Sequence, residues 1–588
     1  MAGHSYFGAS SEKGTLLIKL STKYPQYAIA GSLHECAADN TSRTTTIMED
    51  TTRTPNAMAC AVARSRNKPA VLRVGGGELF DHVYRAVSFD WNDAQARKYH
   101  VVGGGAGTVS AAGGWMASGG LSGTTGMRMY GIGIDQVVHM EAVLPDGRHV
   151  RWGPTAWEPK ADGGYPRTTE VTGFCNTNPY AMNETEWVWE ACDGDDIDFG
   201  ELWFAFRGGG GGSYGVLTSL HYQLHEYPGM LSIVGINPLP FITAAEDGPN
   251  GLDETTGWLV GRAYVEFVLL FLYSPSDLNV TETESRGCSS AHTANMNVFT
   301  GGIFFCYGSS GDVMAAKWRE KIENERAVLE DAEFTPAMID AVMSIISNTA
   351  QVESYAHLGV SDGSDGVPAG RLRDEPRAGL IPLTGPFPNY ADSTHTHFPL
   401  ATFQSNFSTF VDTLAVEALT ASGPHVIYAM GGAIPESDDS LNSLSPTRRQ
   451  AAFLKAVTDE GYRGTYYSWF FPNTTAEFPG SSCHNHANVY DMGPLKTDWT
   501  KPCPGNWSQE ERIEKCISQQ EAAWGTANLN RLEAIKAKVD PDALFICTSG
   551  VGHFKTPTVY TPSAATTFRA TNALRFAVAV SMIPLVLH

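Results

Sequence analysis

Short apolar runs that alternate with polar residues are frequent in the first 225 residues and predict β-strands. The apolar run 137–144 is followed by the turn sequence 145–148 and a second apolar pattern at 149–152, which together predict a β-hairpin. Residues 216–224 also alternate between apolar and polar side chains, as in a half-buried strand. Further strands are expected at 16–18 and 70–74.

Helical spacing of apolar residues becomes visible in the second half of the chain. Asp312 is a candidate N-cap for a helix that contains Met314, Trp318, Ile322 and Ala327. Ser445 and Pro446 form a helix start that opens residues 447–457. Leu529, Leu532 and Ile535 recur at helical spacing, and 540–542 ends that helix. Strands and helices in this arrangement predict an α+β chain with two interleaved domains.

The composition limits the classes of function. Hydrophobic residues make up 42% of the 588 residues and charged residues 18%, so the chain can bury a large core and is not disordered by composition. The sum of Lys and Arg is 41 and that of Asp and Glu is 63, a formal charge of -22. Such an acidic surface repels phosphate backbones, so we expect no nucleic-acid partner.

The ten cysteines contain no C-x-x-C pair and no zinc-finger spacing. Their even number and wide spacing favour disulfides in a secreted protein, and the alternative is scattered buried thiols. N-glycosylation sequons support secretion mildly, and a secreted or cell-surface location is expected. The sequons begin at Asn40, Asn183, Asn279, Asn406, Asn473 and Asn506.

The two ends of the chain differ in character. Residues 1–14 have neither the basic start nor the apolar run of a signal peptide. Residues 576–588 are mostly apolar and too few to span a bilayer. Small residues at 563–565, followed by a polar spacer and this tail, are typical of a GPI-attachment signal and thus of a membrane anchor. The alternative is a terminal segment that docks on the protein.

Two glycine-rich tracts are the main candidates for a ligand site. Tract one covers residues 101–120 and tract two covers residues 207–216. Glycines at this density let backbone N–H groups face a phosphate without clashes from Cβ atoms, whereas the alternative is flexible linkers. Gly210, Gly212 and Gly215 match the bare pattern G-x-G-x-x-G. A Rossmann site is excluded because a strand pattern, not a helix, follows them.

Taken together, the tracts resemble the PCMH-type FAD-binding fold of the vanillyl-alcohol oxidase superfamily. The likeness is strongest to its berberine-bridge-enzyme-like branch, which includes oligosaccharide oxidases. It covers about residues 1–225 and 520–552 and is weak between them. The segments that carry it are 3–8 with 14–21, tract one through Tyr130–Asp135, Leu202–Arg207 with tract two and 215–218, and 524–532 with 540–545.

This resemblance implies a two-part FAD-binding domain made by both chain ends. An inserted α+β substrate domain, with an antiparallel sheet and helices, lies between the two parts. The expected divisions are 1–225 for the FAD-binding domain, 226–500 for the substrate domain, 501–560 for the return to the FAD-binding domain and 561–588 for the tail. The implied reaction is hydride transfer from a small alcohol, sugar or alkaloid-like substrate to the flavin, with O2 as the expected acceptor.

The resemblance also implies which residues contact the cofactor. His4, in the Gly-His-Ser loop, is expected to bond covalently to the flavin ring; the alternative is an ordinary surface histidine. The further expected cofactor-binding residues are Gly3, Ser5, Gly104, Gly105, Thr108, Ser110, Gly113, Gly114, Gly119, Gly120, Val216, Asn485 and Asn528.

Three departures from the family pattern affect these expectations. Ala106 stands where many relatives have a second covalent link through cysteine, so at most one link is expected. Relatives carry an additional stretch before the flavin loop, which here starts at Gly3; either the true start lies upstream or the chain binds FAD poorly. Cys483 stands where relatives often have a tyrosine base, two residues before Asn485.

The expected catalytic bases are therefore His486 and, second, His484, because histidine titrates in a suitable range. The alternative is that both are surface residues. A second pair, His395 and His397, would share one face of a strand and, with His484 and His486, suggests a metal site that no carboxylate pattern supports. Besides the flavoenzyme, a non-catalytic cell-surface binding protein of the same fold and a metal-dependent enzyme remain alternatives.

Overall fold

The computed structural model describes 33–36, 55–88, 99–104, 109–236, 254–290, 302–352, 394–457, 475–477, 492–545 and 551, with short gaps at 118, 122, 182, 193–196, 230, 406, 421–424, 503 and 505. Within these residues, four antiparallel sheets and the helices around them form an α+β fold, as predicted. The predicted strand at 16–18 lies outside the described residues.

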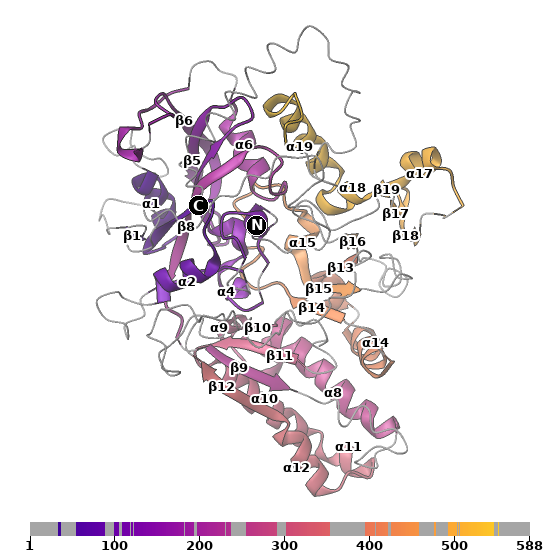
Figure 1. Cartoon of the computed structure of the whole chain (residues 1–588). Helices are drawn as coiled ribbons and strands as arrows, with labels where there is room; N and C mark the ends of the chain where they lie inside the picture. Colours follow the sequence, from indigo (N-terminus) through magenta and orange to yellow (C-terminus); the bar gives the residue numbers. More distant parts are fainter. Residues whose placement is uncertain are drawn as a thin grey trace, which may run out of the picture.

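The largest sheet is built from the first part of the chain (Figure 1). Among the described residues it has eight strands, and β3 pairs with β8 beside the main path. In spatial order the strands are β1 (Leu33–Glu35), β2 (Ala70–Gly75), β8 (Val216–Glu226), β4 (Val137–Val143), β5 (His149–Glu158), β6 (Arg167–Asn176) and β7 (Trp189–Glu190), with β3 at Tyr99–His100. The strands predicted at 70–74 and 216–224 and the hairpin of β4 and β5 are confirmed.

Helices cover both faces of this sheet. Helix α1 (Pro55–Ser65) packs on the face that carries Val71 and Val138. The opposite face, with Leu220 and Tyr222, forms the main core. The helices on the side of this core are α2 (Phe80–Ser88), α3 (Gly114–Ala117), α4 (Met127–Tyr130), α5 (Gly133–Gln136), α6 (Phe199–Phe206), α18 (Gln519–Trp524) and α19 (Thr526–Val539).

A second sheet with its own helices lies in the lower part of Figure 1. Its strand order is β10 (Cys288–Ser290), β11 (Gly302–Tyr307), β9 (Leu231–Ile236) and β12 (Ile346–Val352). Its buried side chains pack against apolar helices in a separate core. The helices of this part are α8 (Glu254–Tyr273), α9 (Glu282–Gly287), α10 (Ser310–Asn324), α11 (Arg326–Asp331), α12 (Pro336–Ser344) and α14 (Phe407–Thr420).

Two smaller sheets complete the described structure. The third has the order β14 (His425–Ala429), β15 (Ala451–Val457), β13 (Thr394–Pro399) and β16 (Thr475–Glu477), and the fourth has the order β18 (Asp498–Pro502), β17 (Met492–Leu495) and β19 (Cys516–Ser518). Short helices at these sheets are α13 (Leu400–Ser405), α15 (Pro446–Gln450) and α17 (Gln509–Lys515). The 3₁₀ turns are η3 (Glu184–Glu186) and η4 (Pro275–Leu278).

The helix predictions are correct at one site and need revision at two. Helix α19 buries Leu529, Leu532 and Ile535 and ends at Val539, as expected. Helix α10 begins at Ser310, so Asp312 is not its N-cap. Asp312 lies in the first turn, where its carboxylate interacts favourably with the helix dipole.

Helix α15 starts as predicted, with Ser445 at the N-cap position and Pro446 first in the helix, but ends after Gln450. The rest of the expected helix is strand β15, because this segment is hydrogen-bonded between β14 and β13. Pairing on both sides outweighs the local helical pattern.

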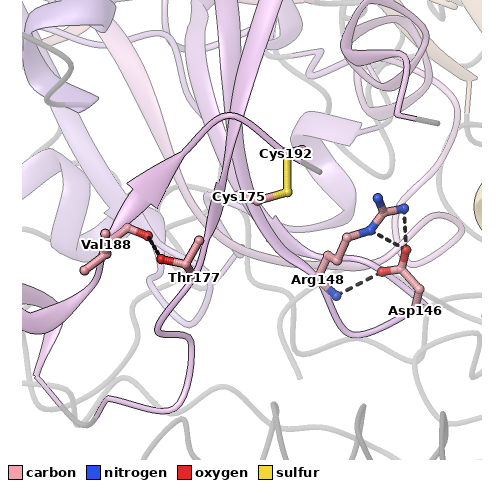
Figure 2. Close-up of a disulfide and its surroundings, with 6 residues drawn as sticks. All are labelled: Asp146, Arg148, Cys175, Thr177, Val188 and Cys192. Atoms are coloured by element: carbon pink, nitrogen blue, oxygen red, sulfur yellow. Dashed lines mark hydrogen bonds and ion pairs between the residues drawn. A yellow bond between two sulfur atoms is a disulfide. The ribbon is translucent and has the colours of Figure 1, made fainter. Parts of the chain in front are cut away.

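Disulfides tie several strands together, which confirms the prediction for these cysteines. Cys175 and Cys192 close the loop between β6 and β7, where the Thr177 hydroxyl also donates to the carbonyl of Val188 (Figure 2). Cys36 and Cys60 join β1 to α1, and Cys288 and Cys306 join the paired strands β10 and β11. Cys516 is disulfide-bonded too, and the described residues contain no free cysteine.

No helix in the described part of the chain is both long and apolar enough to cross a membrane. The apolar tail at 576–588 lies outside the described residues, so the anchor stays a prediction.

Candidate functional site

The two glycine tracts meet in space. The Gly210 N–H of tract two donates to the Ala117 carbonyl of tract one at 3.2 Å. A Cβ atom added to Gly211 would lie 3.0 Å from the Cα of Gly114. The two backbones therefore touch with no side chain between them. We call the half-buried and exposed part of this contact, residues 113–114 and 211–212, the glycine junction.

The start of tract one is packed against aromatic side chains of α2. A Cβ atom on Gly103 would lie 2.5 Å from the Phe80 ring, and one on Gly104 would lie 3.0 Å from it. The Thr125 hydroxyl accepts from the Gly103 N–H at 3.0 Å and donates to its carbonyl at 2.8 Å, while the Tyr84 hydroxyl donates to the Gly104 carbonyl. Protein packing alone thus requires small residues here. A cofactor contact at Gly104 stays a prediction.

Gly119 and Gly120 allow a close approach to helix α5. Both have left-handed φ values, +103° and +73°. A Cβ on Gly120 would lie 2.5 Å from the Cα of Gly133, and the Gly133 N–H donates to the Gly120 carbonyl at 2.9 Å. These two glycines are therefore needed for the pairing of two backbone segments, whether or not a ligand binds near them.

The glycine junction is different because its backbone remains accessible. Gly113 and Gly114 are half-buried, and Gly212 is exposed. Gly212 has φ +73°, and an added Cβ would meet no atom within 4 Å. Next to it, the buried Ser213 hydroxyl has no hydrogen-bond partner among the described residues. An accessible glycine backbone beside an unsatisfied hydroxyl is a donor set that suits an anionic group such as a diphosphate.

The C-terminal return holds tract two in place. The Trp524 indole N–H donates to the Gly208 carbonyl at 2.8 Å, and the Lys536 ammonium donates to the Ser213 carbonyl. Asn528, an expected cofactor residue, donates its side-chain amide to the Ser443 and Leu444 carbonyls at 3.3 Å. In the described structure, Asn528 thus anchors a neighbouring loop.

Two further expected residues lie close to this region. Ser110 is buried and forms a backbone bridge with Leu79, and Val216 begins β8 opposite Val143. Ser110 and Val216 are thus placed by the strands and loops that frame tract one and tract two. Their contact with a cofactor stays a prediction.

A buried charge network fixes the segment 430–450 to tract two and to Arg66 and Asp135. Arg207, which opens tract two, contacts the Asp439 carboxylate at 2.7 Å, and Arg66 contacts it at 3.2 Å. Burial opposes ionisation of Asp439, but the two guanidinium groups outweigh it and hold its pKa below the ordinary value. A second pair, Asp135 and Arg449, meets at 2.7 Å.

Sequence reasoning did not single out Asp439 or Arg449. Arg207 and Asp135 lie within the motifs that resemble the family, but their partners are 232 and 314 residues away in the sequence. No local pattern connects residues so far apart. The fold brings segment 430–450 next to Arg207 and Asp135, and the ion pairs form only there.

Histidines lie on the α1 face of the main sheet. His139 and His221 pack edge to face with ring centroids 5.3 Å apart. Both ring nitrogens of His139 are buried without a hydrogen-bond partner among the described residues. Burial and, to a smaller extent, the neighbouring Arg151 lower the pKa of His139 to about 3, although Glu141 opposes the shift. His139 is therefore neutral in the folded protein.

His149 lies nearby and is bound on both sides. Its ring nitrogens contact the Glu141 carboxylate at 3.0 Å and the Asn176 side-chain amide at 3.1 Å. These two contacts tie His149 of β5 to β4 and β6.

Several expected site residues lie outside the described residues. His395 and His397 lie on strand β13, as expected, but His484 and His486 are not described. The described residues contain no group of three or more His, Cys, Asp or Glu that could hold a metal ion. The remaining expected site residues that are not described are Gly3, His4, Ser5, Gly105, Thr108 and Asn485.

Comparison with known proteins supports the family resemblance. Residues 508–552 match the family model described as "Berberine and berberine like". This match includes α18 and α19, which hold tract two.

The chain is 24% identical over 495 residues to "FAD-linked oxidoreductase notD" of Aspergillus sp. (strain MF297-2), covering 83% of this chain and 61% of that protein. It is 27% identical over 238 residues to "FAD-linked oxidoreductase ffsJ" of Aspergillus flavipes, covering 40% of this chain and 26% of that protein. The chain thus spans less than two thirds of either relative.

The structure is also similar to the crystal structure, at pH 5.0, of the VAO-type flavoprotein MtVAO615 from Myceliophthora thermophila C1. The identity is 16%, the TM-score is 0.44, and the likeness covers 82% of this chain and 67% of that one. The matched segment and the two curated relatives confirm the predicted resemblance. This chain is similar to proteins described as FAD-linked oxidoreductases, and its residues 508–552 match the model of the berberine and berberine-like family.

Proposed function

We propose that the protein is an FAD-dependent oxidoreductase that oxidises a small alcohol, sugar or alkaloid-like substrate, with O2 as the electron acceptor. The observation that carries this proposal is the convergence of three segments. Tract two is hydrogen-bonded to tract one between Gly210 and Ala117, and to the family segment at 508–552 between Gly208 and Trp524. Two relatives of this chain are described as FAD-linked oxidoreductases, which supports FAD as the cofactor of this protein.

The residues at the glycine junction fit the phosphate part of FAD. Gly113, Gly114 and Gly212 offer accessible backbone, and Ser213 has a buried hydroxyl without a partner among the described residues. Peptide N–H and hydroxyl groups donate to phosphate oxygens, and the absence of side chains lets the diphosphate come close. Bound FAD supplies an acceptor for the hydride that leaves the substrate.

The remaining roles follow from the family resemblance and are part of the proposal. His4 bonds covalently to the flavin ring, and Asn485 faces the ring. His486, or His484 as the second choice, accepts the proton of the substrate hydroxyl as the C–H bond breaks. A positioned base typically contributes about 10²–10⁴-fold to the rate.

The visible absorption spectrum of the purified native protein tests the cofactor. The bands of oxidised flavin should be present and should disappear on anaerobic addition of a substrate. A colourless protein that does not take up added FAD would contradict the proposal. Once a substrate is known, His484→Ala, His486→Ala and the double variant test the base. Rates of flavin reduction within a few-fold of wild type in all three would exclude both histidines.

We also propose that the protein is secreted or displayed at the cell surface. The disulfides in three separate parts of the fold support this location, because disulfides persist in oxidising compartments. Asn183, Asn279 and Asn506 are exposed and begin N-glycosylation sequons. Treatment of the native protein with an N-glycosidase should therefore increase its mobility on a gel. An unchanged mobility together with a purely intracellular fractionation would contradict this proposal.

A further inference from the structure

Helix α19 is fixed beside α6, the helix that leads into tract two (Figure 1). The Arg531 guanidinium of α19 contacts the Glu201 carboxylate of α6 at 2.8 Å and lies 3.8 Å from the centroid of the Phe204 ring. Leu532 packs against the start of tract two, since a Cβ atom added to Gly209 would lie 2.8 Å from its side chain. Helix α19 is therefore a rigid support for this tract.

One turn further along α19, the buried Lys536 extends to the end of the glycine run in tract two. Its ammonium group donates to the Ser213 carbonyl, to the Asp540 carboxylate at 2.5 Å and to the Phe545 carbonyl at 2.6 Å. These bonds use all three N–H donors of the ammonium group. Asp540 is fixed in turn, because it accepts from the N–H groups of Leu544 and Phe545 at 2.8 and 2.9 Å. The charge of Lys536 is thus compensated within the protein, and its direction is set.

The bond from Lys536 determines how the peptide unit between Ser213 and Tyr214 is oriented. The described residues contain no cis peptide bond, and in a trans peptide the carbonyl and the N–H point in opposite directions. Because the Ser213 carbonyl faces Lys536, the Tyr214 N–H points away from Lys536. Tyr214 is buried, yet this N–H has no hydrogen-bond partner among the described residues.

Two adjacent donors in the described part of tract two therefore lack an acceptor, the Tyr214 N–H and the buried Ser213 hydroxyl. Buried donors are almost always paired in folded proteins, so an acceptor from outside these residues is expected. The neighbouring Gly212 is exposed, which gives a ligand access to this turn. An anionic oxygen satisfies both donors at once.

We propose that Lys536 is a positioning residue for the diphosphate of FAD, a role that rests on the proposed FAD-dependent function. By holding the Ser213 carbonyl, Lys536 turns the Tyr214 N–H towards a phosphate oxygen, next to the Ser213 hydroxyl. Lys536 does not touch the diphosphate itself, because its three donors are bound within the protein. It acts through the backbone of tract two.

Loss of the ammonium group should weaken FAD binding while the groups that contact the cofactor stay in place chemically. Without the bond from Lys536, the peptide unit can rotate, and the hydrogen bond from Tyr214 to the phosphate is lost. A hydrogen bond to a charged group corresponds to roughly a 10- to 100-fold difference in affinity. We therefore expect the dissociation constant of FAD to rise by this factor in Lys536→Met, which keeps the length of the side chain.

The experiment titrates flavin-free, full-length protein with FAD in a His4→Ala background, which removes the expected covalent bond. Lys538→Met is the matched control, because Lys538 lies on the same helix and is exposed. Asp540→Asn disturbs the same buried ion pair but keeps the ammonium group at Ser213, so it should reduce stability more than FAD affinity. The double variant of Lys536→Met and Asp540→Asn leaves no unpaired carboxylate and should show the same loss of affinity as Lys536→Met.

Hydrogen exchange of the Tyr214 amide gives a readout that a loss of stability alone would not change. In the Lys538→Met control, saturating FAD should slow this exchange, followed by mass spectrometry of peptides that span tract two. In both variants that lack Lys536, saturating FAD should give no such protection.

The outcomes separate this role from FAD binding as such. FAD affinity within twofold of the Lys538→Met control in both variants that lack Lys536 would overturn the positioning role and leave the proposed function intact. Absence of Tyr214 protection in the control protein when FAD is bound would do the same. A control protein that binds no FAD would overturn both the positioning role and the proposed function.

Discussion

A single carboxylate at the glycine junction should weaken FAD binding, and the chain contains a matched control for this change. Gly212 and Gly163 both have left-handed φ values, +73° and +76°, and both are exposed. At either position an added Cβ would meet no atom within 4 Å. Aspartate tolerates this backbone conformation, so Gly212→Asp and Gly163→Asp introduce the same charge with similar, small strain.

The expected loss can be worked out from electrostatics. A carboxylate placed roughly 6 Å from a phosphate charge raises the energy of the complex by about 0.7 kcal/mol in water and by about 3 kcal/mol at an effective dielectric constant near 20. This range corresponds to a loss of roughly 3- to 100-fold in FAD affinity. Gly163 lies in the turn before β6, outside both tracts, so the same charge there should leave the affinity unchanged.

The assay is a titration of flavin-free protein with FAD, followed by quenching of flavin fluorescence. It is best done in a His4→Ala background, which removes the expected covalent bond. Gly212→Asn separates charge from size, since it has a similar shape and no charge. The loss in Gly212→Asp should shrink at high salt, and both Asp variants should show similar thermal unfolding. If Gly212→Asp binds FAD within twofold of Gly163→Asp at low salt, the junction does not hold the diphosphate.

Three further predictions concern pH, buried charge and the covalent link. Burial lowers the pKa of His139 to about 3 in the folded protein. Below about pH 6.5 this histidine takes up a proton in the unfolded state but not in the folded state. The free energy of unfolding therefore falls as the pH drops from 6.5 towards 3. Between pH 6.5 and 4.5 this costs about 2 kcal/mol, and His139→Leu should remove that part of the pH dependence in denaturant unfolding; an unchanged dependence would show that His139 is charged in the fold. Asp439→Asn leaves two buried guanidinium groups without their carboxylate and should destabilise the protein by about 3–5 kcal/mol. The control is Asp146→Asn, which breaks the exposed pair with Arg148 and should destabilise the protein by less than about 1 kcal/mol. Similar losses in both variants would contradict the role of the buried network. Wild-type protein should retain FAD after acid denaturation and His4→Ala should release it; complete release from wild type would exclude a covalent bond.

Local features of the sequence were sufficient for many elements of the fold. The alternation of residues 216–224 predicts β8, and the turn 145–148 between two apolar runs predicts the hairpin of β4 and β5. The spacing of Leu529, Leu532 and Ile535 predicts α19. These predictions were correct because period and turn chemistry act within a few residues, and the buried face of each element is already visible in its pattern.

Local patterns predicted the wrong element where pairing with strands distant in the sequence outweighed the local propensity. Residues 451–457 continue a helical pattern, yet they form β15 because strands β13 and β14 pair with them on both sides. The density of glycine in tract one indicated a ligand. The structure shows that Gly103, Gly104 and Gly120 also admit the Phe80 ring and the Gly133 backbone, which no sequence pattern reveals.

The sequence by itself determined the α+β class, the strands that carry the tracts and the family resemblance, because each rests on short motifs. Only the tertiary structure decided which glycines remain accessible, and it reduced a long glycine-rich region to the junction of residues 113–114 with 211–212. It also paired Arg207 with Asp439. Burial and charge pairing depend on segments hundreds of residues apart, and their energies exist only once the chain has brought those segments together.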